Sequence, residues 1–164
     1  EMSGTEICSF NNSSPSMSNV VVNGNYSNSK GTVTYNGQSY TDCVKMESIT
    51  NIAITPMADC KITLVFGTSD VSKRLKLDNT TFTTDANGMY SFNGTAGTTY
   101  TLTKGDSINL FLIIFEKNNG TGINEIETDN NANNSALYDI QGRRIVAPLK
   151  GQIYIVNGKK FIGK

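Results

Sequence analysis

Short alternations of apolar and polar residues, broken by turn residues at intervals of about eight to twelve, constrain this chain more than any other feature. No segment keeps an apolar i, i+3, i+4, i+7 pattern for three helical turns. Asn36-Gly37 and Asn87-Gly88 are dipeptides that favour tight hairpin turns, because both residues tolerate positive φ. The pattern therefore predicts an all-β protein, with a sandwich or barrel followed by a small C-terminal antiparallel β-module.

The segments expected as strands of the sandwich are residues 5–10, 20–22, 32–35, 39–48, 51–56, 61–66, 74–77, 80–84, 89–92, 98–103 and 108–115. Composition then shifts, because residues 116–122 and 128–135 are dominated by Asn, Gly, Thr and acidic residues, as in linkers. Further strands are expected at residues 136–140, 144–146, 151–156 and 159–162. We place the boundary at Lys117, which gives domains 1–117 and 118–164.

Charge and hydropathy restrict the partners. Fourteen basic and fourteen acidic residues cancel, so we expect no general attraction to nucleic acid or to an anionic membrane. We expect no membrane span, because the longest apolar run, residues 108–115, is far shorter than the ~20 residues that a span needs. The start lacks a signal-peptide pattern, which fits either a mature secreted protein or the C-terminal piece of a longer one.

The nucleophile and metal-ligand inventory argues against catalysis and cofactors. With three Cys and no His, the chain lacks the ligands of a zinc site and the partners of a nucleophilic triad. No motif marks a catalytic pair among the acids, so we expect no enzyme activity and no cofactor; a structural Ca²⁺ on loop acids such as Asp70 stays open. Cys8, Cys43 and Cys60 are either small buried apolar residues or include a Cys43–Cys60 disulfide.

The C-terminal motifs form a distinctive pattern. Residues 138–145 read YDIQGRRI, 148–151 read PLKG, and 153–160 read IYIVNGKK. This tail resembles the C-terminal sorting domain of secreted Bacteroidetes proteins. The resemblance implies export, with type IX (Por) machinery or surface-anchoring machinery as a partner, and an extracellular or cell-surface location. The residues that carry it are Tyr138, Asp139, Gln141, Gly142, Arg143, Arg144, Gly151, Tyr154, Asn157 and Gly158. A small structural β-cap without a transport role is the alternative.

Residues 9–10, 30–34, 36–37, 43–48, 64–67 and 103–111 form a second recognisable set. In these residues the first part of the chain is similar to a module found behind pectate lyases and related polysaccharide-degrading proteins of the same bacteria. The resemblance implies a non-catalytic β-sandwich (jelly roll) that holds plant-type, pectic polysaccharide for an enzyme encoded upstream or nearby. We expect a monomer. The chain departs from many polysaccharide binders in having no Trp.

Several polar residues suit a sugar site. Alternation places Lys45 and Glu47 on one side of their strand and Met46 on the other. Amides and charges bind sugar hydroxyls, Lys binds carboxylates, and aromatic rings pack on sugar C–H faces. The predicted carbohydrate-binding residues are Tyr40, Lys45, Glu47, Lys104, Asp106 and Asn109.

The structural interpretation of these residues is kept beside the functional one. Exposed Lys and Glu on strands commonly pair across an outer face, which would fit a structural spacer or protein-interaction domain without a glycan site. Tyr35 and Tyr40 flank the Asn36-Gly37 turn and are expected to pair across their hairpin, with an exposed stacking platform as the alternative.

Overall fold

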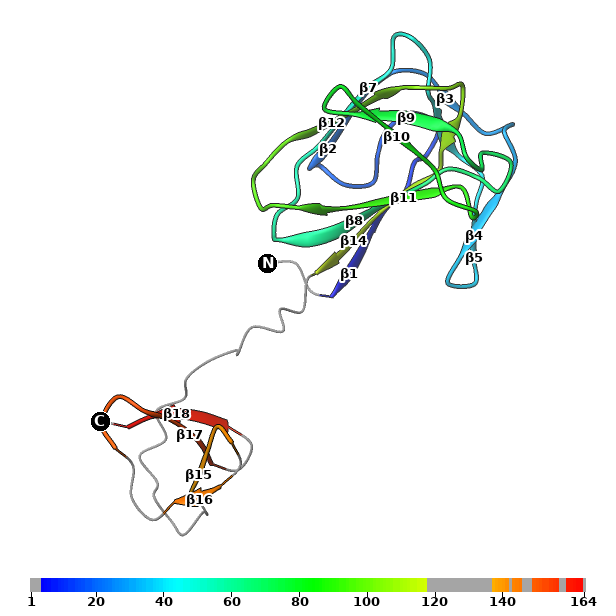
Figure 1. Ribbon diagram of the computed structural model, residues 1–164. Coiled ribbons are helices and arrows are strands. Elements are labelled where there is room, and N and C mark those ends of the chain that lie inside the picture. The colour runs from blue at the N-terminus through cyan, green and yellow to red at the C-terminus, as the bar shows by residue number, and fades with distance from the viewer. Residues whose placement is uncertain (1–3, 118–136, 142, 146–148, 157–158, 164) are drawn as a thin grey trace. The chain divides into compact units, whose positions relative to one another are not determined.

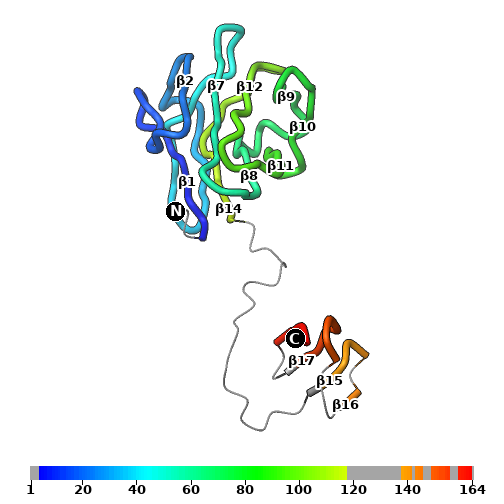
Figure 2. Tube along the Cα trace, turned by 90° about the vertical axis from the view of Figure 1, so that its left-hand side faces the viewer, coloured from blue at the N-terminus to red at the C-terminus, as the bar shows by residue number. Residues whose placement is uncertain are grey.

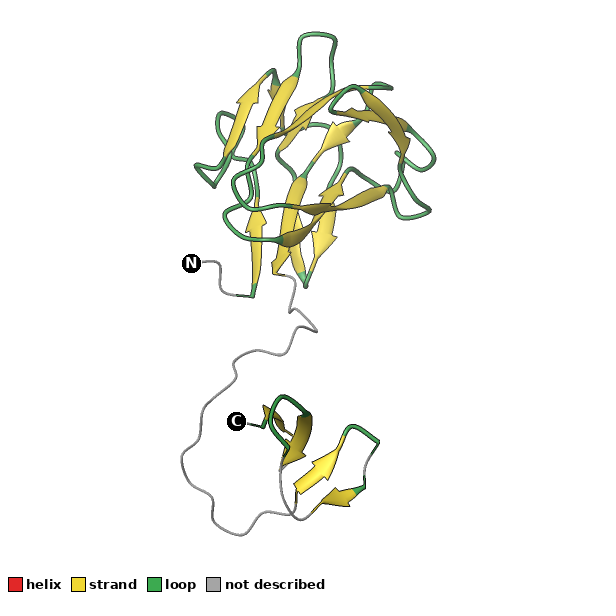
Figure 3. Ribbon diagram, turned by 60° about the vertical axis from the view of Figure 1, so that its left-hand side comes forward, coloured by secondary structure: helices red, strands yellow, loops and turns green. Residues whose placement is uncertain are grey.

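The computed structural model describes residues 4–117, 137–141, 143–145, 149–156 and 159–163 of the chain. These fall into two compact units, Glu1–Asn118 and Asn119–Lys164 (Figure 1). Strands and loops make up all of the described residues (Figure 3), which confirms the predicted all-β class. Within them, no helix of a length and hydropathy suited to crossing a membrane is present.

Two antiparallel sheets face each other in the first unit (Figure 1). The first sheet has the order β1 (Thr5–Cys8), β14 (Leu112–Lys117), β8 (Cys60–Val65), β11 (Met89–Gly94). The second has the order β10 (Thr80–Thr83), β9 (Arg74–Leu77), β12 (Tyr100–Lys104), β7 (Asn51–Ile54), β2 (Val20–Asn23). The predicted β-sandwich is therefore confirmed.

A smaller third sheet and a hairpin complete this unit. The third sheet has the order β13 (Asn109–Leu110), β6 (Cys43–Lys45), β3 (Tyr26–Ser27). The hairpin joins β4 (Val33–Tyr35) to β5 (Gln38–Tyr40). A single residue, Phe111, separates β13 from β14, so the third sheet is tied directly to the first.

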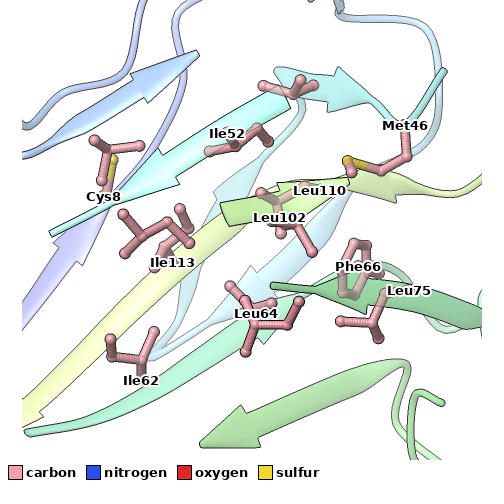
Figure 4. Close-up of a cluster of buried hydrophobic side chains, with 14 of the residues drawn as sticks. Cys8, Met46, Ile52, Ile62, Leu64, Phe66, Leu75, Leu102, Leu110 and Ile113 are labelled. Atoms are coloured by element: carbon pink, nitrogen blue, oxygen red, sulfur yellow. The ribbon is translucent and has the colours of Figure 1, made fainter. Parts of the chain in front are cut away.

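Alternating apolar residues of the two large sheets form the main core. Ile62 and Leu64 of β8 and Ile113 of β14 point toward Ile52 of β7 and Leu102 of β12 (Figure 4), and all five are fully buried. The opposite face of the first sheet is also covered. Buried residues there include Val65, Phe111, Leu112 and Ile114, and side chains of the β4–β5 hairpin pack against them. The first sheet is thus covered on both faces around Val65 and Leu112, while Lys61 and Glu116 at its other end stay exposed.

Two predicted strands are each divided in the structure. The segment 39–48 separates into β5 and β6, and 108–115 separates at Phe111 into β13 and β14, which belong to different sheets. The Phe111 amide donates to the Val65 carbonyl at 2.8 Å, which holds the chain at this change of sheet. A continuous apolar run has no alternation, so periodicity gives no sign of the break. Strand β3 was not predicted, because two residues are too short to show a period.

Register corrects the expected tyrosine pair. The two-residue turn Asn36-Gly37 sets Tyr35 opposite Gln38 and Tyr40 opposite Val33, so the tyrosines are diagonal neighbours rather than a direct pair. Both are half-buried against the second cluster beneath the hairpin. They are therefore packing residues, and neither is a freely exposed stacking platform.

The structure decides between a disulfide and buried free thiols for the three cysteines. Cys8, Cys43 and Cys60 are free thiols and are fully buried. The Cys43–Cys60 disulfide is therefore wrong, while the interpretation as small buried apolar residues is confirmed. Cys8 and Cys60 lie in the main core, and Cys43 lies in the second cluster, so the two proposed partners occupy different packing layers.

The second unit is a four-stranded antiparallel sheet with the order β16 (Arg144–Ile145), β15 (Leu137–Asp139), β17 (Ile153–Val156), β18 (Lys159–Ile162). Strands β15, β16 and β17 are labelled in Figure 2. The small C-terminal module was expected, and its last strand has the predicted bounds. Strand β17 begins two residues later than predicted, since Gly151 has a φ of 79° and belongs to the preceding turn.

A core truncation tests the sandwich. Leu64→Ala should lower the free energy of unfolding of the first unit by about 2–5 kcal/mol, because the side chain is fully buried and leaves a cavity. Val21→Ala, at a side chain 55% exposed on β2, should change it by less than ~0.5 kcal/mol. Urea denaturation of the full chain measures both values. Equal losses in the two variants would contradict this assignment of the core.

Candidate functional site

A carboxylate pairs with a lysine where β6 ends, and the charge of a second lysine acts on it. The Lys45 Nζ lies 3.0 Å from Glu47 Oε1, and the Asn25 side-chain amide donates to Glu47 Oε2 at 2.7 Å. The Asn25 hydrogen bond, then the Lys45 contact, lowers the pKa of Glu47, and the charge of Lys104 acts in the same direction. Lys45, Glu47 and Lys104, three of the predicted site residues, are thus within electrostatic reach of one another.

A tight turn after β6 sets this arrangement. The Glu47 amide donates to the Lys45 carbonyl at 3.0 Å and to Thr50 Oγ1 at 3.0 Å, while the Thr50 hydroxyl donates to the same carbonyl at 2.6 Å. Met46 is buried in the main core between them. Lys45 and Glu47 therefore share the solvent side, as strand alternation predicted, with their side chains 31% and 39% exposed.

Asn109 joins the group through strand pairing. It lies opposite Lys45 in the β13–β6 ladder, so its side chain is on the same face as that of Lys45. Its backbone amide donates to Asp70 Oδ2 at 3.2 Å, and Asp70 is only 8% exposed. The nearly buried carboxylate of Asp70 therefore fixes the backbone of β13 beside Lys45.

Lys30 is a residue that the sequence interpretation missed. Burial raises the pKa of the Cys43 thiol to about 11, and among the charges acting on that thiol the largest effect is from Lys30, followed by Asp42, Asp70 and Lys45. Lys30 and Lys45 therefore lie near the same buried residue. Lys30 is exposed in an irregular stretch before Gly31, where no periodic pattern marks it. We call Lys30, Lys45 and Lys104 the lysine cluster.

Asp106, also predicted for the site, is engaged elsewhere. Its carboxylate accepts from Arg74 Nη2 at 2.7 Å and from the Arg74 amide at 2.8 Å, and its own amide donates to the Arg74 carbonyl at 2.8 Å. The neighbouring Gly105 approaches Arg74 so closely that a Cβ there would lie 2.4 Å from the Arg74 carbonyl. The Arg74 hydrogen bonds lower the pKa of Asp106 to about 2. This residue clamps the β12–β13 turn to β9.

Tyr40 also has a packing role. It faces the second apolar cluster from β5, with Val33 as its cross-strand partner. No aromatic residue among residues 4–117 is in the exposed class, so none of them forms an open platform on which a sugar ring could stack.

The electrostatics of the described residues suit binding better than acid catalysis. Each carboxyl with a shifted pKa, namely Glu47, Asp106 and Asp139, is shifted downward. A glycosidic bond is cleaved with the help of a carboxylic acid whose pKa is raised. The described residues also contain no group of three His, Cys, Asp or Glu side chains placed to hold a metal ion.

In the second unit, Asp139 organises the turn of the first hairpin. Its Oδ1 accepts from the amides of Gln141 and Arg143, both at 2.9 Å, and its Oδ2 lies 2.7 Å from Arg143 Nε. Backbone donation by Arg143 is the main reason that the pKa of Asp139 is lowered. The predicted sorting residues Gly142, Asn157 and Gly158 lie outside the described residues.

The other predicted sorting residues divide into buried and exposed groups. Tyr154 is buried, and its hydroxyl accepts from the Leu149 amide. Gly151 occupies a left-handed position that favours glycine, and its amide donates to Gly163 at 2.7 Å. Tyr138 and Arg144 are instead exposed on neighbouring strands.

Comparison with known proteins places this geometry in context. Residues 4–113 match the family described as carbohydrate binding module 77. A solved structure that is 36% identical comes from work described as "The complexity of the Ruminococcus flavefaciens cellulosome reflects an expansion in glycan recognition". The match covers 70% of this chain and 95% of that one, with a TM-score of 0.60.

A second solved structure, a peptidoglycan O-acetylesterase, is 16% identical over 70% of this chain and 34% of its own, with a TM-score of 0.45. This likeness is too distant to inform function. No curated protein matches the chain.

The Arg74–Asp106 clamp makes a titration prediction. The folded pKa of Asp106, about 2, is below the ordinary value of ~3.9, so the clamp stabilises the fold above about pH 4 and is lost as pH falls through 2. Arg74→Gln should raise the pKa of Asp106 toward its ordinary value. Lys61→Gln, which removes a lysine paired with Glu116, should leave it unchanged. Carboxyl NMR titration reads both variants, and an unmoved pKa in Arg74→Gln would refute the assignment.

Proposed function

We propose that the first unit of this chain, which belongs to the carbohydrate-binding module 77 family, holds an acidic, pectic polysaccharide at the lysine cluster. Membership of the family makes the first unit a carbohydrate-binding module. The description of the 36%-identical structure, which speaks of glycan recognition, supports the same class of ligand. The module would act as the ancillary part of a degradation system, outside the cell or at its surface.

The observation that carries the acidic specificity is the placing of three lysines along β6 and the turn after it: Lys45 ends the strand, the charge of Lys30 acts on Cys43 at its start, and that of Lys104 acts on Glu47 just beyond it. A polyuronate presents carboxylates at regular intervals, and ammonium groups bind carboxylates through short, charge-assisted hydrogen bonds. The Asn25 and Asn109 amides and the Glu47 carboxylate supply partners for sugar hydroxyls. Binding would therefore depend on charge and hydrogen bonds more than on aromatic stacking.

The Lys45–Glu47 ion pair is compatible with this role. Exposed pairs of this kind contribute about 0–1 kcal/mol, so a ligand carboxylate can take over Lys45 at small cost. The same pair is also what a structural spacer or protein-interaction domain without a glycan site would present. Binding measurements on the lysine variants distinguish the two functions.

Substitution of the cluster tests the proposal. Lys45→Ala and Lys104→Ala should each weaken binding to de-esterified homogalacturonan by roughly 10-fold or more, because each removes a charge-assisted contact. Lys61→Ala is the matched control, because Lys61 lies near the start of β8, is paired with Glu116 and is not in the lysine cluster. This variant should bind as the unchanged chain does. Calorimetry at two salt concentrations should show weaker binding at the higher one.

Two outcomes would count against the proposal. The first is equal binding of methyl-esterified and de-esterified polymer, since esterification removes the carboxylates. The second is an absence of heat with every glycan tested, which would favour the structural alternative.

We further propose that residues 118–164 direct export or surface attachment, on the strength of the tail motifs. The Asp139 turn supports this, because hydrogen bonds from the Gln141 and Arg143 amides to Asp139 hold these motif residues in a defined geometry that a receptor can read. The partner would be the type IX machinery or an anchoring system of the host cell.

Deletion tests the tail. In a bacterium with type IX machinery, a version lacking residues 118–164 should accumulate in the periplasm, while the full chain reaches the surface or medium. Asp139→Ala should lower export, since it removes three hydrogen-bonding contacts of the turn. Lys61→Ala, in the first unit, serves as the control. Normal export of the truncated chain would rule out a sorting role.

A further inference from the structure

The second unit carries an unusual aromatic side chain. Across the described residues, which include every Tyr and Phe of the chain, Tyr138 is the only aromatic residue in the exposed class, at 38% exposed. Buried and half-buried rings in the first unit are accounted for by packing. Packing does not account for the position of the Tyr138 ring, because the packed face of its sheet is the opposite one.

The packing of that sheet shows which face is open. Asp139, Tyr154 and Phe161 lie opposite one another across β15, β17 and β18 and therefore share a face. Tyr154 on this face is 2% exposed, and its hydroxyl contacts the backbone of Leu149. Gly151 and Gln152 bond to Gly163 beside it. The segment 149–152 thus covers this face and leaves the Tyr138 face open.

On the open face, four side chains form one row across the sheet. Arg144 of β16 lies opposite Tyr138 of β15, Tyr138 opposite Ile155 of β17, and Ile155 opposite Lys160 of β18. Arg144 and Lys160 are exposed. Because neighbouring strands are ~4.8 Å apart, the backbones of Arg144 and Lys160 lie about 14 Å apart across the sheet, and the Tyr138 ring lies between them. We call Arg144, Tyr138, Ile155 and Lys160 the cationic row.

The charge of the unit favours an anionic ligand. The residues described between 137 and 163 include five basic side chains and one acidic one, Asp139. That carboxylate is already bound to Arg143 and to two backbone amides. Its charge is therefore compensated within its own turn.

We propose that the cationic row is a second binding site for acidic polysaccharide. The Tyr138 ring packs on the C–H face of one sugar, and Arg144 and Lys160 bind carboxylates of sugars on either side. The choice of a pectic ligand rests on the proposed function of the first unit. Because both sites belong to one chain, a polymer long enough to reach both gains affinity through effective concentration.

A sugar chain fits the row better than a protein surface does. The open face offers one ring, 38% exposed, over a span of about 14 Å, and Ile162, 55% exposed, lies two strands away on β18. A stable protein interface buries about 800 Å² on each partner around an apolar centre. A narrow line of ring and cations instead matches an extended polyanion.

The test uses the full chain with two ligands, de-esterified homogalacturonan polymer and a short oligogalacturonide. The double variant Arg144→Gln/Lys160→Gln and the single variant Tyr138→Ala should each weaken polymer binding by at least ~10-fold through lost avidity. Oligogalacturonide binding at the lysine cluster should not change. Tyr138→Phe should restore polymer binding, because the ring remains. Lys150→Gln removes an exposed charge of the same unit outside the row and should have no effect.

A second arm separates this inference from the first-unit site. In a Lys45→Ala/Lys104→Ala background, residual polymer binding should persist and should disappear when the row variants are added. In the unchanged chain, the NMR chemical shifts of the amides on β15, β16 and β18 should move when polymer is added. In the variants without polymer, the dispersion of the same amide shifts should show that the sheet is still folded.

Three results would overturn the cationic row as a glycan site. The first is polymer binding that is the same in all row variants as in the unchanged chain. The second is a Lys150→Gln variant that weakens polymer binding as much as the double variant does. The third is normal polymer binding together with failed export in the row variants, which would assign the row to a protein partner. In each of these cases the lysine-cluster variants still report independently on the first unit.

Discussion

Strand β14 is the element on which the structure of the first unit depends. Four consecutive residues, from Leu112 to Phe115, are buried, and they alternate between the main core and the cluster beneath the β4–β5 hairpin. Hydrophobic burial on both faces fixes the position of this strand in the middle of the first sheet. Because β13 precedes it by one residue, the same burial also fixes Asn109 opposite Lys45. The polar site is therefore held by an apolar strand that does not itself touch it.

Charges in the first unit have two different roles. The Arg74–Asp106 clamp combines a side-chain pair with two backbone hydrogen bonds and joins the end of β12 to β9, so it is part of the fold. The Lys45–Glu47 pair is half-exposed and held mainly by local contacts, and such pairs exchange partners at little free-energy cost. A binding surface benefits from this second kind of pair. The lysine stays hydrated and oriented by Glu47 until a ligand carboxylate replaces the Glu47 carboxylate as its partner.

The C-terminal motif separates in the same way. Asp139, Gly151 and Tyr154 are satisfied by internal contacts and shape the small sheet. Tyr138 and Arg144 lie on its open face. A motif that looks uniform in sequence thus contains residues that shape the fold and residues that the fold presents to a partner.

The sequence alone determined the all-β class, the small C-terminal sheet and the outward placement of Lys45 and Glu47, because each depends on local turn chemistry or on period-two alternation. It left the tertiary structure to decide the rest. Nothing local distinguishes Asp106, which clamps Arg74, from a free loop acid, or brings the charge of Lys30 to Cys43 of β6. The split at Phe111 was equally hidden, since a run buried on both faces has no period. Contacts between distant segments arise only when burial closes the sheets over one another.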